Sequence, residues 1–93
     1  MTVKIFIKRT VTESSEEELT VLLQRMRSVC LMQSGYISGQ TLKRLDRPGE
    51  RLVISIWESI EDWENWFNNS ERREIQLEID SLLGEETTYE IYN

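Results

Sequence analysis

Residues 51–67, RLVISIWESIEDWENWF, join two kinds of hydrophobic pattern. The run 52–57 is short and apolar, which is typical of a strand. Ser59 then supplies the kind of side chain that begins a helix. Three aromatic residues follow at helical spacing and share one side of that helix: Trp63, Trp66 and Phe67. The stretch therefore predicts a strand that leads directly into an amphipathic helix.

On the amino-terminal side, residues 3–11 alternate between apolar and polar positions and predict a further strand. A helix is then predicted that stops at Gly35. Both Ser14 and Ser15 are followed three residues later by a glutamate, which is the spacing of a capping box. The apolar residues of this helix recur at steps of three and four: Leu19, Leu22, Leu23, Met26, Val29 and Cys30. We therefore expect one side of this helix to face a core.

Residues 36–45 and 52–57 predict a hairpin, because the turn 46–50 between them contains proline and glycine. A further helix is predicted over Ser70–Gly84, with the serine as its cap and the glycine as its end. The last segment, 87–92, has the β-branched and aromatic residues of a fourth strand. The resulting order βαββαβ, with the second helical region in two pieces, is that of the ferredoxin-like α+β fold. In that fold a four-stranded antiparallel sheet carries its helices on one face.

A chain of 93 residues and 11.1 kDa is expected to form a single domain over residues 1–93. Its 39% hydrophobic and 30% charged residues are typical of a globular protein. Histidine is absent, which excludes a Ser-His-Asp triad, a histidine-ligated haem or zinc and an imidazole base. The one cysteine, Cys30, excludes an internal disulfide and a multi-cysteine metal site, and it fits a reducing compartment.

The net charge of −6 argues against a nucleic-acid partner, whose phosphates attract basic proteins. We interpret the small basic stretch of Lys4, Lys8 and Arg9 as the solvated edge of the first strand. No segment has the length of an apolar membrane span or the apolar region of a signal peptide. We therefore expect a cytoplasmic protein that binds neither nucleic acid nor membrane.

The third predicted strand does not alternate between apolar and polar residues, as a strand with one solvated face should. Its two faces both carry apolar side chains: Leu52, Ile54 and Ile56 on one, and Val53 and Trp57 on the other. Phe6 interrupts the polar face of the first strand in the same way. Because the chain has no spare element to cover a second apolar face, we predict a homodimer packed sheet to sheet. The alternative is a monomer that tolerates a few exposed apolar residues.

Four segments, in this order, resemble the antibiotic biosynthesis monooxygenase (ABM) domain family: 35–39 (GYISG), 52–59 (LVISIWES), 61–66 (EDWENW) and 70–73 (SERR). The resemblance covers most of the chain. It implies a ferredoxin-like subunit that pairs into a dimeric α+β barrel, in agreement with the homodimer expected from the strand pattern. The family includes cofactor-independent monooxygenases of phenols and hydroquinones, haem-degrading enzymes, and members that act on small signalling molecules.

The same resemblance argues against haem degradation. The haem-ligating histidine of those enzymes falls at Gln76 in this chain, and their first-strand asparagine falls at Ile7. Both replacements remove polar groups that the reaction needs. Trp66, in contrast, matches a pocket residue of the family.

Apolar residues are the first candidates for the wall of a substrate cavity between helices and sheet. We expect Trp57, Trp66 and Leu23 to form this wall, with Trp63 and Phe67 beside them. The alternative for each ring is simple core packing, because an aromatic stripe on a helix is first of all a buried face.

Polar anchors for a substrate oxygen are sought nearby. Arg73 or its neighbour Arg72 is suited to an anionic oxygen, unless it pairs with glutamates on the helix surface. Gln76 is a second candidate, and a solvent-facing glutamine is its alternative. Three tyrosines have a phenolic proton to donate, or pack with a hydrated hydroxyl: Tyr36, Tyr89 and Tyr92. Cys30 is interpreted as a small buried hydrophobe, and no residue is identified as a base.

Together these features predict a cofactor-independent monooxygenase that oxidises a small phenol or hydroquinone with O2. The resemblance implies that the substrate supplies the electrons, so neither a metal nor a flavin is expected. The residue set for this function is Trp66, Trp57, Leu23, Arg73, Gln76 and Tyr36. Two alternatives stay open: a non-catalytic dimeric module that binds a small ligand or a partner, and a non-redox isomerase.

Overall fold

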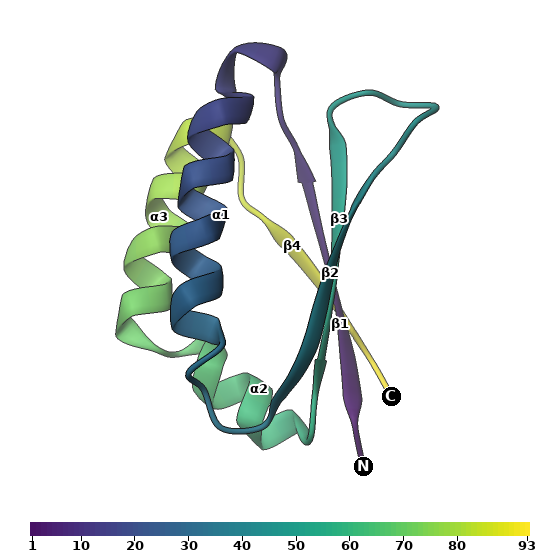
Figure 1. The fold of residues 1–93 in the computed structure, drawn as a ribbon, viewed down its shortest axis with the longest axis vertical. Helices are drawn as coiled ribbons and strands as arrows, with labels where there is room; N and C mark the ends of the chain where they lie inside the picture. Colours follow the sequence, from purple (N-terminus) through teal and green to yellow (C-terminus); the bar gives the residue numbers. More distant parts are fainter.

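The computed structural model describes all 93 residues and has the predicted βαββαβ order. Its elements, with a short 3₁₀ helix η1 before α1, are β1 (Val3–Thr10), η1 (Glu13–Ser15), α1 (Glu16–Cys30), β2 (Tyr36–Lys43), β3 (Glu50–Trp57), α2 (Ile60–Phe67), α3 (Ser70–Leu83) and β4 (Thr88–Tyr92). The four antiparallel strands are ordered β2-β3-β1-β4, and all helices lie on one face of the sheet (Figure 1). The ferredoxin-like α+β fold is therefore confirmed. None of its helices has the length and hydropathy needed to cross a bilayer.

The helix-facing side of the sheet carries the core. Strand register places Val3 opposite Trp57 and Ile5 opposite Ser55, so that alternate residues of β1 and β3 face the helices together. Two groups of buried apolar residues result: Val3, Ile5, Trp57, Trp63 and Trp66 in one, and Val11, Leu19, Ile75 and Ile79 in the other. The aromatic stripe of the opening stretch is thus divided, because Trp63 and Trp66 are buried whereas Phe67 is partly exposed.

The opposite side of the sheet has no helix over it (Figure 1). Register places six apolar side chains on this outer face: Phe6, Leu42, Leu52, Ile54, Ile56 and Tyr92. Phe6 lies opposite Ile54, and the rings of Phe6 and Tyr92 meet edge to face with centroids 5.1 Å apart. The two-faced apolar pattern predicted for the third strand is therefore present.

The interpretation of the basic stretch as a solvated edge is wrong for two reasons. β1 pairs with β3 on one side and β4 on the other, so it is an inner strand. The inward alternation of Val3, Ile5 and Ile7 also continues to Arg9, which is buried. Lys4 and Lys8 do face outward, as expected for the polar positions of the strand.

The ends of α1 differ from the prediction. The helix ends at Cys30, and Ser15, its N-cap, makes no side-chain capping hydrogen bond because η1 already leads into the helix. Gly35 lies instead in the turn before β2, with a φ of 84°. A Cβ atom there would lie 2.5 Å or less from side-chain atoms of Asp62, so this turn needs glycine for both its backbone angle and its space.

The second helical region breaks where predicted, but its cap is shifted by one residue. The N-cap of α3 is Asn69, whose side chain accepts a hydrogen bond from the backbone N–H of Arg72, and Ser70 is already helical. The predicted end of α3 at Gly84 is confirmed, since the backbone N–H of Gly84 donates to the carbonyl of Asp80.

The cap of α2 gives a first testable prediction. The Ser59 hydroxyl accepts a hydrogen bond from the Asp62 N–H at 3.1 Å and donates one to the Asp62 carboxylate at 2.9 Å. Ser59→Ala should therefore lower the free energy of unfolding by about 1 kcal/mol, measured by urea denaturation. Ser15→Ala is the matched control and should cost only a few tenths of that, because Ser15 makes no capping bond. Equal losses in the two variants would contradict the prediction.

Candidate functional site

A cavity of about 340 Å³ lies between α1 and the β2-β3-β1 part of the sheet. Small residues form much of its floor, since Gly39 on β2 lies opposite Ser55 on β3 and Thr41 lies opposite Val53. Its lining residues include Ile7, Arg9, Leu19, Leu23, Met26, Cys30, Tyr36, Gly39, Thr41, Val53, Ser55 and Trp66. A floor of short side chains leaves space that longer ones would fill, so the cavity follows directly from the residues of these strands.

Tyr36 reaches the cavity through an irregularity in β2. Register shifts between Tyr36 and Ser38, so that Tyr36 lies opposite Trp57 and Gly39 lies opposite Ser55, all on the helix-facing side. A Cβ on Gly39 would lie 2.7 Å from the Tyr36 hydroxyl oxygen, so the phenol lies directly over this glycine. Burial raises the pKa of Tyr36, and the hydroxyl is therefore a proton donor at neutral pH.

The aromatic wall consists of two layers. Trp66 lines the cavity, and Trp57 lies behind it with its ring stacked on Trp66 at a centroid distance of 6.3 Å. Trp57 also meets Tyr36 edge to face at 5.4 Å, and its indole N–H donates to the Ser55 hydroxyl at 3.2 Å. Trp57 is fully buried, so it supports two lining residues and does not itself face the cavity.

Arg9 brings a buried positive charge to the cavity. Its guanidinium donates one long hydrogen bond, of 3.4 Å, to the side-chain oxygen of Gln76, and its Nε atom has no partner. Gln76 in turn donates to Asp80 and Thr87, each at 2.8 Å. Burial lowers the pKa of Arg9 from its ordinary value, but arginine is basic enough to stay charged at neutral pH. A buried donor without a partner destabilises a folded protein by about 1–3 kcal/mol, so the Nε atom of Arg9 lowers the stability of this fold.

Arg72 is also buried, and two of its guanidinium nitrogens are hydrogen-bonded. It donates to the carbonyl of Phe67 at 2.9 Å and to the Tyr89 hydroxyl, and its guanidinium lies over the Phe67 ring at 4.5 Å. Arg73, the arginine preferred from the sequence, is exposed on α3 and does not line the cavity. Arg73 therefore does not reach this cavity, since on this helix the 3.6-residue repeat turns Arg72 inward and Arg73 toward solvent.

Charged residues also line the rest of the cavity. Arg51 forms an ion pair with Glu16, and Lys43 lies 3.9 Å from the same carboxylate oxygen. Arg27 lines the cavity from α1 and has no ion pair. Burial raises the pKa of Cys30 to about 12, so the side chain is a neutral thiol, as expected for a small buried hydrophobe.

The structure thus brings together three of the six predicted site residues, Leu23, Tyr36 and Trp66. Trp57 and Gln76 lie one layer behind the cavity. Ile7 lines it with an apolar side chain, and the Gln76 amide is engaged in hydrogen bonds with Arg9, Asp80 and Thr87. No three histidine, cysteine, aspartate or glutamate side chains lie close enough together to hold a metal ion.

Sequence comparison identifies one family. The family model for antibiotic biosynthesis monooxygenase (ABM) matches residues 2–77, which is most of the chain and includes every strand except β4. No match was found among curated protein sequences.

Solved structures match over the whole chain. A conserved protein from Methanosarcina mazei Go1 is 18% identical, covers 100% of this chain and 92% of its own, and has a TM-score of 0.91. SnoaB, a cofactor-independent oxygenase from Streptomyces nogalater, is 13% identical, covers 99% and 91%, and has a TM-score of 0.87. A protein from Mycobacterium tuberculosis is 14% identical, covers 100% and 94%, and has a TM-score of 0.86. At these identities the similarity shows the fold alone.

Proposed function

The chain belongs to the antibiotic biosynthesis monooxygenase family, and on that premise we propose that it oxidises a small electron-rich aromatic substrate with O2 without a cofactor. The observation that carries the proposal is the cavity between α1 and the sheet. Its volume of about 340 Å³ is roughly twice that of a cavity that holds one benzene molecule, so it suits a substrate of two small rings. SnoaB, which has the same fold, is a cofactor-independent oxygenase.

The proposed reaction balances without an external reductant. The phenol loses its hydroxyl proton, and the phenolate passes one electron to O2. The phenoxyl radical and superoxide then join through a C–O bond at the ring carbon para to the hydroxyl, and the peroxide takes up a proton. Loss of the hydrogen on that carbon, with cleavage of the O–O bond, releases water and leaves a quinone. One phenol and one O2 give one quinone and one water.

The chain's own residues serve this reaction by orientation and exclusion of water. Trp66 and Leu23 present apolar surface to the ring, and the Tyr36 hydroxyl is placed to donate to a substrate oxygen. The one carboxylate in the lining, Glu16, is paired with Arg51 and Lys43. Proton removal from the substrate therefore depends on stabilisation of its anion, without a free carboxylate or an imidazole as base.

Filling the cavity is the direct test. Gly39→Val should lower the rate of O2 consumption with 1-naphthol and other phenols that carry hydrogen at the para carbon by at least about tenfold, because the added side chain occupies the cavity and displaces the Tyr36 phenol. Gly39 has no positive φ, so the strand should accept the change. Tyr36→Phe is the matched control for the hydroxyl, since it keeps the ring and leaves the volume open.

Oxygen consumption is measured with an electrode, and folding of each variant is checked by circular dichroism. Unchanged turnover in a folded Gly39→Val variant would show that the chemistry occurs elsewhere. Binding of naphthols in the wild type without any O2 consumption would instead favour the second candidate, a ligand-binding module. The paired state of Glu16 favours that candidate, because it leaves the cavity without a free base.

We further propose that the outer face of the sheet packs against a second copy of the chain. The helices cover one side of the sheet only, and the apolar side chains Phe6, Ile54 and Ile56 lie at the centre of the other. The arrangement leaves the cavity accessible, because the cavity lies on the helix side. A self-complementary contact of two such faces is the ordinary route to a twofold dimer.

A further inference from the structure

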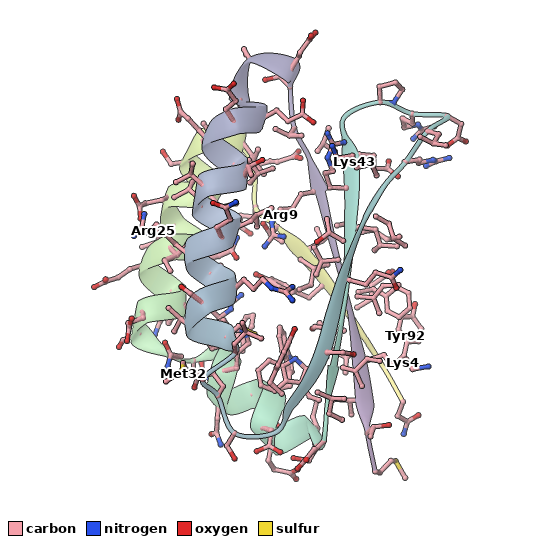
Figure 2. The ribbon with its side chains drawn as sticks, viewed as in Figure 1. Lys4, Arg9, Arg25, Met32, Lys43 and Tyr92 are labelled. Carbon is pink, nitrogen blue, oxygen red and sulfur yellow. The ribbon has the colours of Figure 1, made fainter.

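Arg9 combines three properties that a purely structural arginine would not need. Its side chain is only 6% exposed, its Nε atom has no hydrogen-bond partner, and no carboxylate lies within ion-pair distance. It lines the cavity, and Figure 2 shows it in the space between the sheet and the helices. We propose that the cavity binds an oxyanion carried on an aromatic ring, and that Arg9 selects for the negative charge.

Arg72 provides an internal comparison. It is buried to a similar degree, with 4% exposure, and packs in the same layer between the helices and the sheet. Two of its guanidinium nitrogens donate to a backbone carbonyl and to the Tyr89 hydroxyl, and the group lies over two aromatic rings. Arg9, in contrast, donates one long hydrogen bond, and its buried Nε atom has no partner. The fold thus engages the buried Arg72 more fully than Arg9, which lines the cavity.

The charge of the cavity is opposite to that of the protein. Four basic residues line the cavity against one acidic residue, a net of +3, whereas the whole chain has a net charge of −6. The five residues are Arg9, Arg27, Lys43, Arg51 and Glu16. Because Glu16 is already paired with Arg51, it does not neutralise Arg9. Positive charge gathered in a low-dielectric cleft focuses the field on an anion that enters it.

The polar and apolar residues of the lining define the ligand class. Guanidinium donors form charge-assisted hydrogen bonds to carboxylate and phenolate oxygens, and these are roughly twice as strong as neutral ones. Trp66 and Leu23 supply apolar surface for the ring. The aromatic part of this inference rests on the proposed function, whereas the charge selection rests on Arg9. For a phenol substrate the same cation would hold the reactive phenolate form.

Charge selection is measured with a matched pair of probes at pH 7. Titration calorimetry should show that 2-naphthoate binds the wild type at least about tenfold more tightly than its neutral counterpart 2-naphthamide. Arg9→Met, which keeps the length and apolar character of the stem, should reduce this ratio to about one. Arg25→Met is the control, because it removes the same charge from an arginine that points away from the sheet (Figure 2).

A second probe separates phenolates from carboxylates. The absorbance of 4-nitrophenol reports its ionisation, and Arg9 should lower the pKa of the bound phenol by about one unit or more in the wild type but not in Arg9→Met. A preference in either probe that depends on Arg9 supports the proposal. Equal affinities for naphthoate and naphthamide, together with an unchanged or raised pKa of bound nitrophenol, would overturn it.

These readouts do not involve O2, so the two proposals can fail separately. Oxygen consumption without charge selection would leave the monooxygenase proposal standing and remove the role of Arg9. Charge selection without oxygen consumption would support the role of Arg9 and contradict the monooxygenase proposal. Should Arg9→Met fold poorly, equal affinities of the wild type for the two naphthalene probes, with no lowered pKa of bound nitrophenol, would still overturn the proposal.

Discussion

Trp57→Ala should lower the free energy of unfolding by about 3–5 kcal/mol, the range for removal of a large buried ring. Trp57 is completely buried, and its ring contacts three other aromatic side chains, Tyr36, Trp63 and Trp66. Its alanine replacement would leave a cavity among these rings and remove the indole donor to Ser55. Since the free energy of unfolding of a small domain is only about 5–15 kcal/mol, Trp57→Ala should remove a large part of it.

The effect is measured by denaturant unfolding followed by far-ultraviolet circular dichroism, because tryptophan fluorescence would change with the substitution itself. Trp57→Phe should lose less, since it keeps an aromatic ring in the same layer. Leu77→Ala is the surface control and should stay within about 0.5 kcal/mol, because Leu77 is 71% exposed on α3. A loss below about 1.5 kcal/mol in Trp57→Ala would mean that the neighbouring rings collapse into the space and that the wall behind the cavity is not rigid.

The same residue links stability to the site. Trp57 holds Tyr36 on one side and Trp66 on the other, and both of these line the cavity. The sequence placed Trp57 in the cavity wall, whereas the structure places it behind the wall. Trp57 on β3 and Trp66 on α2 both point between the sheet and the helices, so their rings lie in two layers. The alternation of residues along the strand does not tell which of the two rings lines the cavity.

The fold could be predicted because its signals are local and repeated. The switch from the strand at 52–57 to the Ser59-capped helix, and the alternation of Val3, Ile5 and Ile7, depend only on spacing along the chain. The misplaced boundaries have tertiary causes. Gly35 serves a turn pressed against Asp62, and Asn69 takes the cap that Ser70 was expected to provide.

The site could be predicted only in part. Tyr36 faces the cavity because of the register shift in β2, which a strand pattern does not reveal. By charge Arg9 belongs with Lys4 and Lys8, but its odd-numbered position shares the inward face of Ile5 and Ile7. The two-residue period of the strand predicts a buried side chain at this position, whereas the rarity of buried arginine predicts an exposed one.

Ile54→Lys should convert a dimer into a monomer. Ile54 lies at the centre of the outer face, opposite Phe6 on β1 and Gln40 on β2, and it points away from the core. In a twofold dimer each substitution occurs twice, so two unpaired ammonium groups would lose water in one apolar interface. We expect the dimer dissociation constant to rise by at least about 100-fold, with the helical content unchanged, as measured by analytical ultracentrifugation against the subunit mass of 11.1 kDa.

Leu77→Lys is the matched control, because it makes the same apolar-to-lysine change and the same change in net charge at an exposed site on α3. It should leave the assembly intact, since the helix layer lies on the other side of the sheet (Figure 1). A monomeric wild type, or a dimer that survives Ile54→Lys but not Leu77→Lys, would contradict the sheet-to-sheet arrangement. Loss of the dimer in Leu77→Lys alone would place the interface on the helices, close to the cavity. The apolar side chains of the outer face would then be solvent-exposed, as scattered apolar residues on protein surfaces commonly are.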